Sequence, residues 1–347
     1  MSGRTTSLTI EAAERFRTGV LSVAPMMDRT DRHYRFFLRQ ISRHVRLYTE
    51  MVTTHAILNG PRDKLLAYDP EEHFLALQVG GDDPKDLAEV AKIAEDYGYD
   101  EINLNVGCPS DRVQSGCFGA VLMRTPERVA KGVAAMRAKT NIAVTVKHRI
   151  GVDELDRYED MANFVATVAK SGCTQFAVHA RKAWLNGLSP KENRTIPPLR
   201  YDDVYRLKAE FPELTIEING GITTLDEVDV HLAHVDAVMI GRAAYDNPYL
   251  FASVDRRYYG AKTPVLSRHE VVERMVPYVE RQIAEGTRLH SVTRHMLGLF
   301  VGQRGARAFK RHLSENATKK DATAQTLLDA VALVPPIDEP QGATSSM

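Results

Sequence analysis

Residues 215–242, TIEINGGITTLDEVDVHLAHVDAVMIGR, contain the repeating unit that decides the fold. The apolar run 215–219 ends in two glycines, residues 224–233 have the spacing of an amphipathic helix, and a second apolar run, 237–240, precedes Gly241. Two short apolar runs joined by one helix are typical of parallel strands, because a parallel connection needs a crossover of this length.

The same alternation continues back to the first apolar run of the chain. We predict strands at residues 21–24, 47–50, 74–79, 101–106, 142–147, 175–179, 215–219 and 237–240. We predict intervening helices at residues 84–97, 126–138, 158–171, 201–210 and 224–233. Eight such repeats predict an α/β fold, a (β/α)8 TIM barrel with strands buried on both faces. An open doubly wound sheet would need a glycine fingerprint after its first strand, where this chain has APMMDRTD (24–31).

The pattern changes after Pro264 to helices alone. We therefore expect a catalytic barrel in residues 1–260, a C-terminal all-helical domain in 265–334 and a disordered polar tail in 335–347. A chain of 347 residues is long enough for a barrel and an accessory domain.

Composition excludes several classes of protein. The three cysteines, Cys108, Cys117 and Cys173, have no CxxC spacing, and His231 and His234 have no evident third ligand, so neither a disulfide framework nor a metal site is expected. No apolar run approaches the roughly 18 residues of a membrane span, and the first residues are polar. These features predict a cytoplasmic protein without membrane contact, and no obligatory protein partner is evident.

Charge is balanced overall, with 45 basic and 45 acidic residues, but it is unevenly distributed. Residues 281–320 contain nine Lys or Arg and two acidic residues, an excess of seven positive charges. Local excess of this kind is typical of a surface that neutralises nucleic-acid phosphates. The alternative is a solvated basic helix face.

The ends of the last two predicted strands indicate a phosphate site. Gly220 and Gly221 follow one strand, Gly241 and Arg242 follow the next, and Thr223 and Thr224 can cap the intervening helix. Barrels often bind phosphate in these loops, because glycine backbones allow amide groups to approach an anion closely. The alternative is a pair of ordinary tight turns.

Three further side chains at strand ends could carry chemistry. Lys147 could stabilise negative charge on a reduced flavin, form a Schiff base or pair with an acid at the rim. His179 could be a general acid, a phosphate contact or a core histidine. Cys108 suits a proton donor as well as a nucleophile, because an ordinary thiol is protonated at pH 7. We interpret Cys117 and Cys173 as buried, inert thiols.

Several motifs together resemble the tRNA-dihydrouridine synthases, specifically their A type. The resemblance extends from about residue 21 to 317 and rests on APMMDRTD, EINLNVGCPSDRVQSGCFGA, VTVKHRIG, HARKAWLNGLSPKENRTIPPL, INGGI, VMIGRAAYDNP and GARAFKRHLSENA. It implies an oxidoreductase that binds FMN, uses NADPH as reductant and converts D-loop uridines 20 and 20a of tRNA to dihydrouridine.

The resemblance also implies residue roles. Flavin contacts are expected at Pro25, Met26, Met27, Gln78, Lys147, His179, Asn219, Gly220, Gly221, Gly241 and Arg242. Contacts to tRNA are expected at Asn105, Lys191, Arg194, Arg307 and Lys310. Hydride would pass from flavin N5 to uracil C6, and Cys108 would supply the proton at C5.

Three other functions remain as alternatives. A flavin enzyme acting on a free small molecule, such as a dihydroorotate-type dehydrogenase, would leave the basic helical segment without a role. A Schiff-base aldolase would use Lys147 covalently, and a non-catalytic RNA-binding module would not need Cys108.

One arginine pattern is ambiguous. Arg32, Arg35, Arg39, Arg43 and Arg46 have helical spacing, which would place them on one face of the first barrel helix. Because outer barrel helices lie away from the mouth, we expect a solvated outer face rather than RNA contact.

Overall fold

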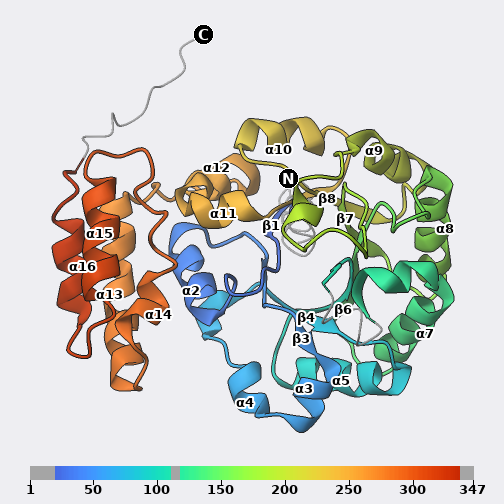
Figure 1. Cartoon of the computed structure of the whole chain (residues 1–347), viewed down its shortest axis with the longest axis horizontal. Coiled ribbons are helices and arrows are strands. Elements are labelled where there is room, and N and C mark those ends of the chain that lie inside the picture. The colour runs from blue at the N-terminus through green and yellow to red at the C-terminus, as the bar shows by residue number, and fades with distance from the viewer. Residues whose placement is uncertain (1–19, 111–117, 337–347) are drawn as a thin grey trace, which may run out of the picture.

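The computed structural model describes residues 20–110 and 118–336. Its parallel sheet runs in the order β1-β9-β8-β7-β6-β5-β4-β2 and curves into a barrel (Figure 1). A parallel bridge between Ser22 and Arg46 joins the first strand to the second and closes the barrel. The strands are β1 (Leu21–Val23), β2 (Leu47–Tyr48), β4 (Leu75–Gly80), β5 (Glu101–Val106), β6 (Ala143–Arg149), β7 (Gln175–His179), β8 (Thr215–Asn219) and β9 (Ala237–Ile240), with β3 (Val52–Thr53) also pairing with β4.

The predicted (β/α)8 barrel is confirmed, and β5, β7, β8 and β9 have the predicted bounds. The second strand is shorter than predicted. It ends at Tyr48, and the hydroxyl of the next residue, Thr49, donates to the Glu50 carbonyl and accepts the backbone N–H of Gln78. A side chain thus replaces a ladder bond, and the chain pairs with β4 again only at β3.

Helices surround the strands. They are α2 (Arg32–Ile41), α3 (Thr54–Asn59), α4 (Arg62–Leu65), α5 (Pro84–Asp96), α7 (Pro126–Arg137), α8 (Tyr158–Ala169), α9 (Tyr201–Glu210), α10 (Leu225–Leu232), α11 (Arg242–Asp246) and α12 (Val254–Tyr259). α5 illustrates why they form. Asp83 accepts two backbone N–H groups at its start, Pro84 occupies the first turn, and Leu87, Val90 and Ala91 are buried against the barrel.

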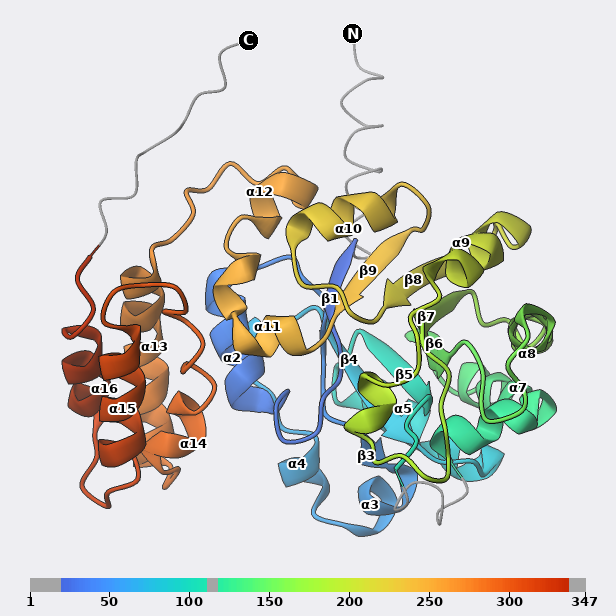
Figure 2. The same cartoon turned by 45° about the horizontal axis from the view of Figure 1, so that its top comes forward.

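After α12 the described chain contains helices only. α13 (Arg268–Ala284), α14 (Leu289–Thr293), α15 (Ala306–Asn316) and α16 (Ala324–Val331) pack together beside α2, on one side of the barrel (Figures 1 and 2). The Phe300 and Phe309 rings meet edge to face at 4.8 Å inside this bundle. Within the described ranges, no helix combines the length and apolar character needed to cross a membrane.

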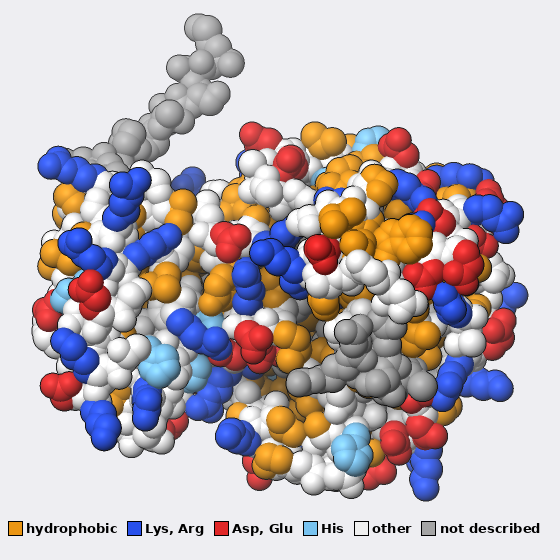
Figure 3. All heavy atoms as spheres, in the orientation of Figure 1, with side chains coloured by type: hydrophobic (Ala, Val, Ile, Leu, Met, Phe, Trp, Pro, Cys, Tyr) orange, Lys and Arg blue, Asp and Glu red, His pale blue; other side chains and the backbone are white. Residues whose placement is uncertain are grey.

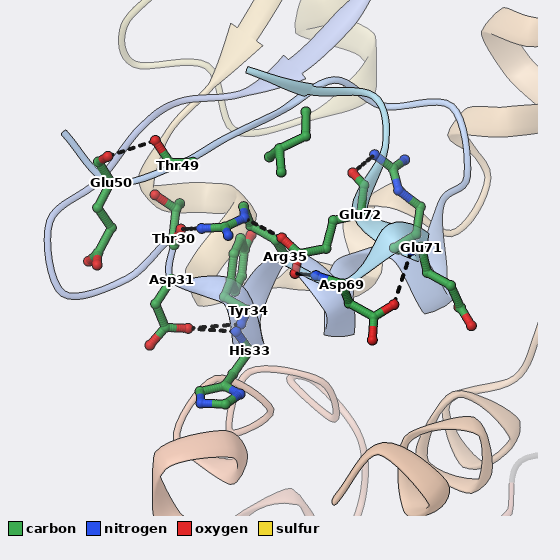
Figure 4. A network of polar contacts seen from close by, with 12 residues as sticks. Thr30, Asp31, His33, Tyr34, Arg35, Thr49, Glu50, Asp69, Glu71 and Glu72 are labelled. Atoms are coloured by element: carbon green, nitrogen blue, oxygen red, sulfur yellow. Dashed lines mark hydrogen bonds and ion pairs between the residues drawn. The ribbon is translucent and has the colours of Figure 1, made fainter. Parts of the chain in front are cut away.

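The expected solvated arginine face is wrong. Arg35 is buried and donates to Glu72 at 2.6 Å and to the Thr30 carbonyl (Figure 4). Arg39 is also buried and bonds to the Glu72 carbonyl. Arg46 lies beyond the helix and pairs with Glu101 at 3.0 Å inside the barrel.

The helical bundle explains part of this difference. It covers α2, so the helix lies between two packed units rather than on an outer surface (Figure 2). Phe36 of α2 stacks on Tyr278 of α13 at 3.9 Å, and Asp31 at the start of α2 pairs with Arg294 at 2.6 Å. Of the five arginines, Arg43 alone is exposed.

Candidate active site

The predicted site residues lie at the carboxyl ends of the strands. Below the mouth, the carboxamides of three strand residues form a chain. Gln78 donates to Asn103 at 2.8 Å and accepts from Asn105 at 2.9 Å. All three are buried, so satisfied amide bonds fix the orientation of this layer.

Asn105 holds the start of the Cys108 loop. Its side-chain oxygen accepts the backbone N–H groups of Gly107 and Cys108, both at 3.0 Å. The carboxamide of Asn105 therefore points into the chain. The predicted contact with RNA would require it to exchange its bond to Gln78, Gly107 or Cys108 for one to the RNA. Asn105 positions the loop that carries the thiol.

Cys108 is half-buried at the mouth, with its thiol 3.5 Å from the Ser110 hydroxyl. Its carbonyl accepts the Ala120 N–H at 2.9 Å. The Arg149 guanidinium donates to the carbonyl of Gly107, the residue before Cys108, at 2.9 Å. A buried cation therefore lies next to the segment that carries the thiol.

Lys147 extends from β6 toward the end of β8, where its Nζ lies 3.3 Å from the side-chain oxygen of Asn219. Withdrawal from water, together with the nearby Arg149 guanidinium, lowers the pKa of Lys147 to about 8. At neutral pH its amine is mostly a cation, but it releases a proton more readily than an ordinary lysine. The rim ion pair considered from the sequence is not formed with any described acidic residue.

His179 lies at the end of β7, beside Gly220. Burial and the neighbouring Arg149 and Lys147 cations hold the pKa of His179 well below its ordinary value. Its imidazole is therefore neutral at pH 7, and a role as a cationic acid is disfavoured. A Cβ atom at Gly220 would lie 2.7 Å from the imidazole ring, so only glycine permits this packing.

The glycine turns after β8 and β9 partly match the expected phosphate cradle. Gly220 and Gly221 have φ values of 120° and 75°, which favour glycine. Gly241 immediately precedes α11, and a Cβ atom there would only touch the Ala24 side chain at 3.9 Å, while Arg242 donates to the Arg194 carbonyl at 3.2 Å. Backbone amides and a guanidinium group are suitable donors for a phosphate.

The start of α10 corrects one part of that expectation. Thr224 caps the helix as predicted, accepting the N–H of Glu227 at 3.2 Å. However, the Glu227 carboxylate accepts the N–H groups of Thr223 and Thr224. These amides already have an anionic partner within the chain, so they are not open donors for a phosphate.

The loop after β1 carries the remaining predicted flavin contacts. Pro25 and Met26 are half-buried, and Met27 is 57% exposed. Thr30 accepts the N–H of Met26 at 3.0 Å, which holds the turn. The three residues present apolar surface at the same end of the barrel as Lys147 and His179.

Arg149 is a site residue that sequence reasoning missed. It is buried at the end of β6 and donates to the carbonyls of Gly107 at 2.9 Å, Lys182 at 3.1 Å and Asn193 at 2.9 Å. It therefore joins the Cys108 loop to the loop after β7. The sequence predicted that this strand ends at residue 147, whereas β6 continues to Arg149. A prediction with the correct end would have placed Arg149 at the mouth.

The predicted tRNA contacts occupy two separate places. Lys191 and Arg194 are exposed beside η3 (Glu192–Arg194), in the loop after β7. Arg307 and Lys310 are exposed on α15, in the helical bundle. Buried Phe309 and Leu313 fix the inner face of α15, so the two basic side chains are directed outward.

Cys173 has the properties expected of an inert thiol. It is fully buried, and burial raises its pKa to about 12. Cys117 lies outside the described residues. In the described part of the chain, no three His, Cys, Asp or Glu side chains are grouped in a way that could hold a metal ion.

Comparisons with known proteins identify the family of the chain. The family model of dihydrouridine synthases (Dus) matches residues 22–334. A tRNA-dihydrouridine(20/20a) synthase of Synechocystis sp. is 61% identical over 90% of this chain and 93% of that protein. Proteins with the same name from Vibrio cholerae and Escherichia coli (strain K12) are 59% and 57% identical, over 91% of this chain and 96% and 92% of theirs.

A solved structure has a related fold. The complex of a 2-naphthoyl-CoA reductase with 2-naphthoyl-CoA aligns with a TM-score of 0.52 and 10% sequence identity. The alignment covers 68% of this chain and 49% of that one, so this chain spans about half its length. At this identity the similarity concerns the fold and not the function.

Proposed function

Because the chain belongs to the dihydrouridine synthase family, we propose that it reduces the C5=C6 bond of uridines 20 and 20a in the D-loop of tRNA. The observation that carries the proposal is the position of Cys108. Its thiol is half-buried after the end of β5, on a loop whose backbone is held by Asn105 and Arg149. A proton donor at that position is what reduction of a conjugated double bond requires.

FMN is the cofactor that the mouth residues fit best, with NADPH as reductant. Gly220, Gly221, Gly241 and Arg242 would hold the phosphate with backbone amides and a guanidinium group. The residues that would line the ring are Pro25, Met26, Met27, Gln78, Lys147, His179 and Asn219. When bound, FMN supplies hydride chemistry at its N5 atom.

The chain's own residues complete the reaction. Hydride addition at uracil C6 leaves enolate character at C5, which must receive a proton. Cys108 donates this proton, and the Lys147 cation offsets negative charge at the mouth. The low pKa of His179 leaves it neutral, so it serves as a hydrogen-bonding contact rather than as a second acid.

Two basic regions would hold the RNA. Lys191 and Arg194 lie next to the mouth, where the target base must enter after leaving its stack. Arg307 and Lys310 lie on the helical bundle and would bind phosphates farther along the tRNA. These four exposed residues form the proposed tRNA surface, and a contact from buried Asn105 to the target base would require one of its present bonds to be exchanged.

A direct assay tests the function. Purified protein carrying FMN is incubated with NADPH and with tRNA from a strain that lacks dihydrouridine, and the product is mapped at nucleotide resolution. We expect dihydrouridine at positions 20 and 20a. Turnover of free dihydroorotate without modification of tRNA would instead establish a small-molecule dehydrogenase, and borohydride trapping of Lys147 with an aldehyde would establish an aldolase.

A further inference from the structure

Trp184, the only tryptophan of the chain, is 40% exposed in the loop between β7 and α9. One face of its ring is covered by the Lys182 ammonium, which lies 3.9 Å from the ring centroid. Tryptophan is enriched at binding interfaces, where its ring supplies a large contact area, so a partly exposed one on a loop of the site is a candidate binding residue.

The Trp184 ring is held in place. The Asn193 carboxamide accepts the backbone N–H of Trp184 and donates to the backbone carbonyl of Trp184, both at 2.8 Å. Lys182 is in turn bonded to the Asp156 carboxylate at 2.7 Å and to the Asp153 carbonyl at 3.2 Å. The backbone and the covered ring face are therefore fixed before any ligand binds, which lowers the entropic cost of stacking.

Trp184 is also connected to the reacting end of the site. Asn193 accepts a bond from Arg149 at 2.9 Å, and Arg149 donates to the carbonyl of Gly107, the residue before Cys108. The backbone segments that carry the indole and the thiol are thus joined by hydrogen bonds through Asn193 and Arg149. A base stacked on Trp184 would be held at a set distance from the base that Cys108 protonates.

The charge around Trp184 fits a polyanion. Lys191 and Arg194 are exposed in the same loop, and Arg194 forms no side-chain hydrogen bond or ion pair with the described residues. Figure 3 shows a group of hydrophobic side chains on this face of the barrel, with both basic and acidic side chains beside them. Aromatic faces next to unpaired cations are typical of sites that bind single-stranded RNA.

We propose that Trp184 is a stacking platform for a nucleobase of the tRNA D-loop that neighbours the uridine being reduced. The inference rests on the proposed function, because it requires tRNA at the barrel mouth. A base splayed beside the extruded uridine would stack on the exposed face of the indole, opposite Lys182.

The single tryptophan permits a direct measurement in the FMN-loaded protein. We expect unmodified tRNA to quench Trp184 emission and to protect the indole from acrylamide, and we expect 0.5 M salt to reverse both effects as it releases the RNA. Free N-acetyltryptophanamide controls for absorption by the RNA. Unchanged acrylamide quenching at saturating tRNA, or protection by NADPH instead of tRNA, would overturn the proposal.

Substitutions give a second, independent test by filter binding. Trp184→Ala should weaken tRNA affinity by on the order of tenfold, and Trp184→Phe should restore most of it, since stacking needs only an aromatic face. Reduction of FMN by NADPH should be unchanged in both. Val230→Ser, at a 61% exposed position on α10, is the matched control and should bind tRNA normally.

The outcomes separate this inference from the proposed function. If the wild-type protein forms dihydrouridine in tRNA while Trp184→Ala binds and reduces tRNA normally, the stacking role is wrong and the function stands. If no dihydrouridine is formed by the wild-type protein, the proposed function itself fails.

Discussion

The Lys147 ammonium lies 3.3 Å from the Asn219 carboxamide oxygen, which joins the ends of β6 and β8 across the barrel mouth. Asn219 also donates to the Met239 carbonyl of β9 at 2.7 Å, so the orientation of its amide is fixed. Three strands thereby hold one cation over the mouth. Since the pKa of Lys147 is lowered to about 8, this cation is sensitive to pH in the range of ordinary assays.

FMN affinity should therefore depend on pH through Lys147. A ligand that accepts a hydrogen bond from the ammonium form raises the pKa of that amine, so binding is strongest below the pKa of the free protein and weakens as pH rises above about 8. Titrations of the apoprotein with FMN between pH 6 and 9.5 would measure this.

Lys147→Arg is the control for this prediction, because a guanidinium keeps its charge throughout that range. The variant should show little change in FMN affinity between pH 8 and 9.5. An equal loss of affinity in the variant and the wild type would show that another group titrates.

Glu217 should destabilise the fold at alkaline pH. It is buried in the barrel and accepts from the Ser22 hydroxyl at 2.6 Å, and burial raises its pKa to about 7. Because the folded pKa exceeds the unfolded one, stability falls as pH rises from about 4.5 to about 7 and then stays low.

Glu217→Gln removes this ionisation and should stabilise the protein by about 1–3 kcal/mol at pH 8, with little gain at pH 4.5. Thermal unfolding of both proteins at the two pH values provides the measurement. The same gain at both pH values would mean that packing, and not ionisation, separates the variants.

The Arg35–Glu72 pair should be indispensable to the fold. Glu72 is fully buried, so Arg35→Met would leave its charge unpaired and should lower the free energy of unfolding by about 3–5 kcal/mol. Exposed Arg43 is the matched control, and Arg43→Met should change the free energy of unfolding by less than about 0.5 kcal/mol. Urea denaturation compares the two; equal effects would contradict the burial of Arg35.

Asp31 should control how firmly the helical bundle attaches to the barrel. Its carboxylate caps α2 through His33 and Tyr34 and pairs with Arg294 and His295 of the bundle. Asp31→Asn keeps an acceptor for the cap but loses the charge. We expect faster hydrogen exchange in α14 and several-fold weaker tRNA binding, with FMN reduction by NADPH unchanged.

Asp329→Asn, at an exposed position on α16, is the control for this variant. It should bind tRNA like the wild type. If Asp31→Asn also bound tRNA normally, attachment of the bundle through this carboxylate would not contribute to RNA binding.

The barrel could be predicted because its signals are local. Each strand is a short apolar run that ends in glycine or a polar residue, and the bounds of β5 and β7 were predicted to the residue. The cap at Thr224 could also be predicted, because its partner Glu227 is three residues away.

The buried arginines could not be predicted, because their partners are distant in the sequence. Arg35 depends on Glu72, and Arg46 depends on Glu101 and on closure of the barrel at Ser22. The spacing of arginines along a helix is the same whether their side chains are solvated or form buried ion pairs, so it cannot distinguish the two. In the site, Lys147 and His179 could be identified because they lie at predicted strand ends. Arg149 was missed because β6 extends two residues beyond its predicted end.

The role of Cys108 is the central claim, and single-turnover kinetics tests it most directly. Cys108→Ala is loaded with FMN, reduced with NADPH and mixed with tRNA in the absence of oxygen. If the thiol donates the proton at C5, reduction by NADPH and tRNA affinity should match the wild type, while reoxidation by tRNA should slow by at least about 100-fold. Reoxidation at the wild-type rate, with dihydrouridine formed, would contradict the account.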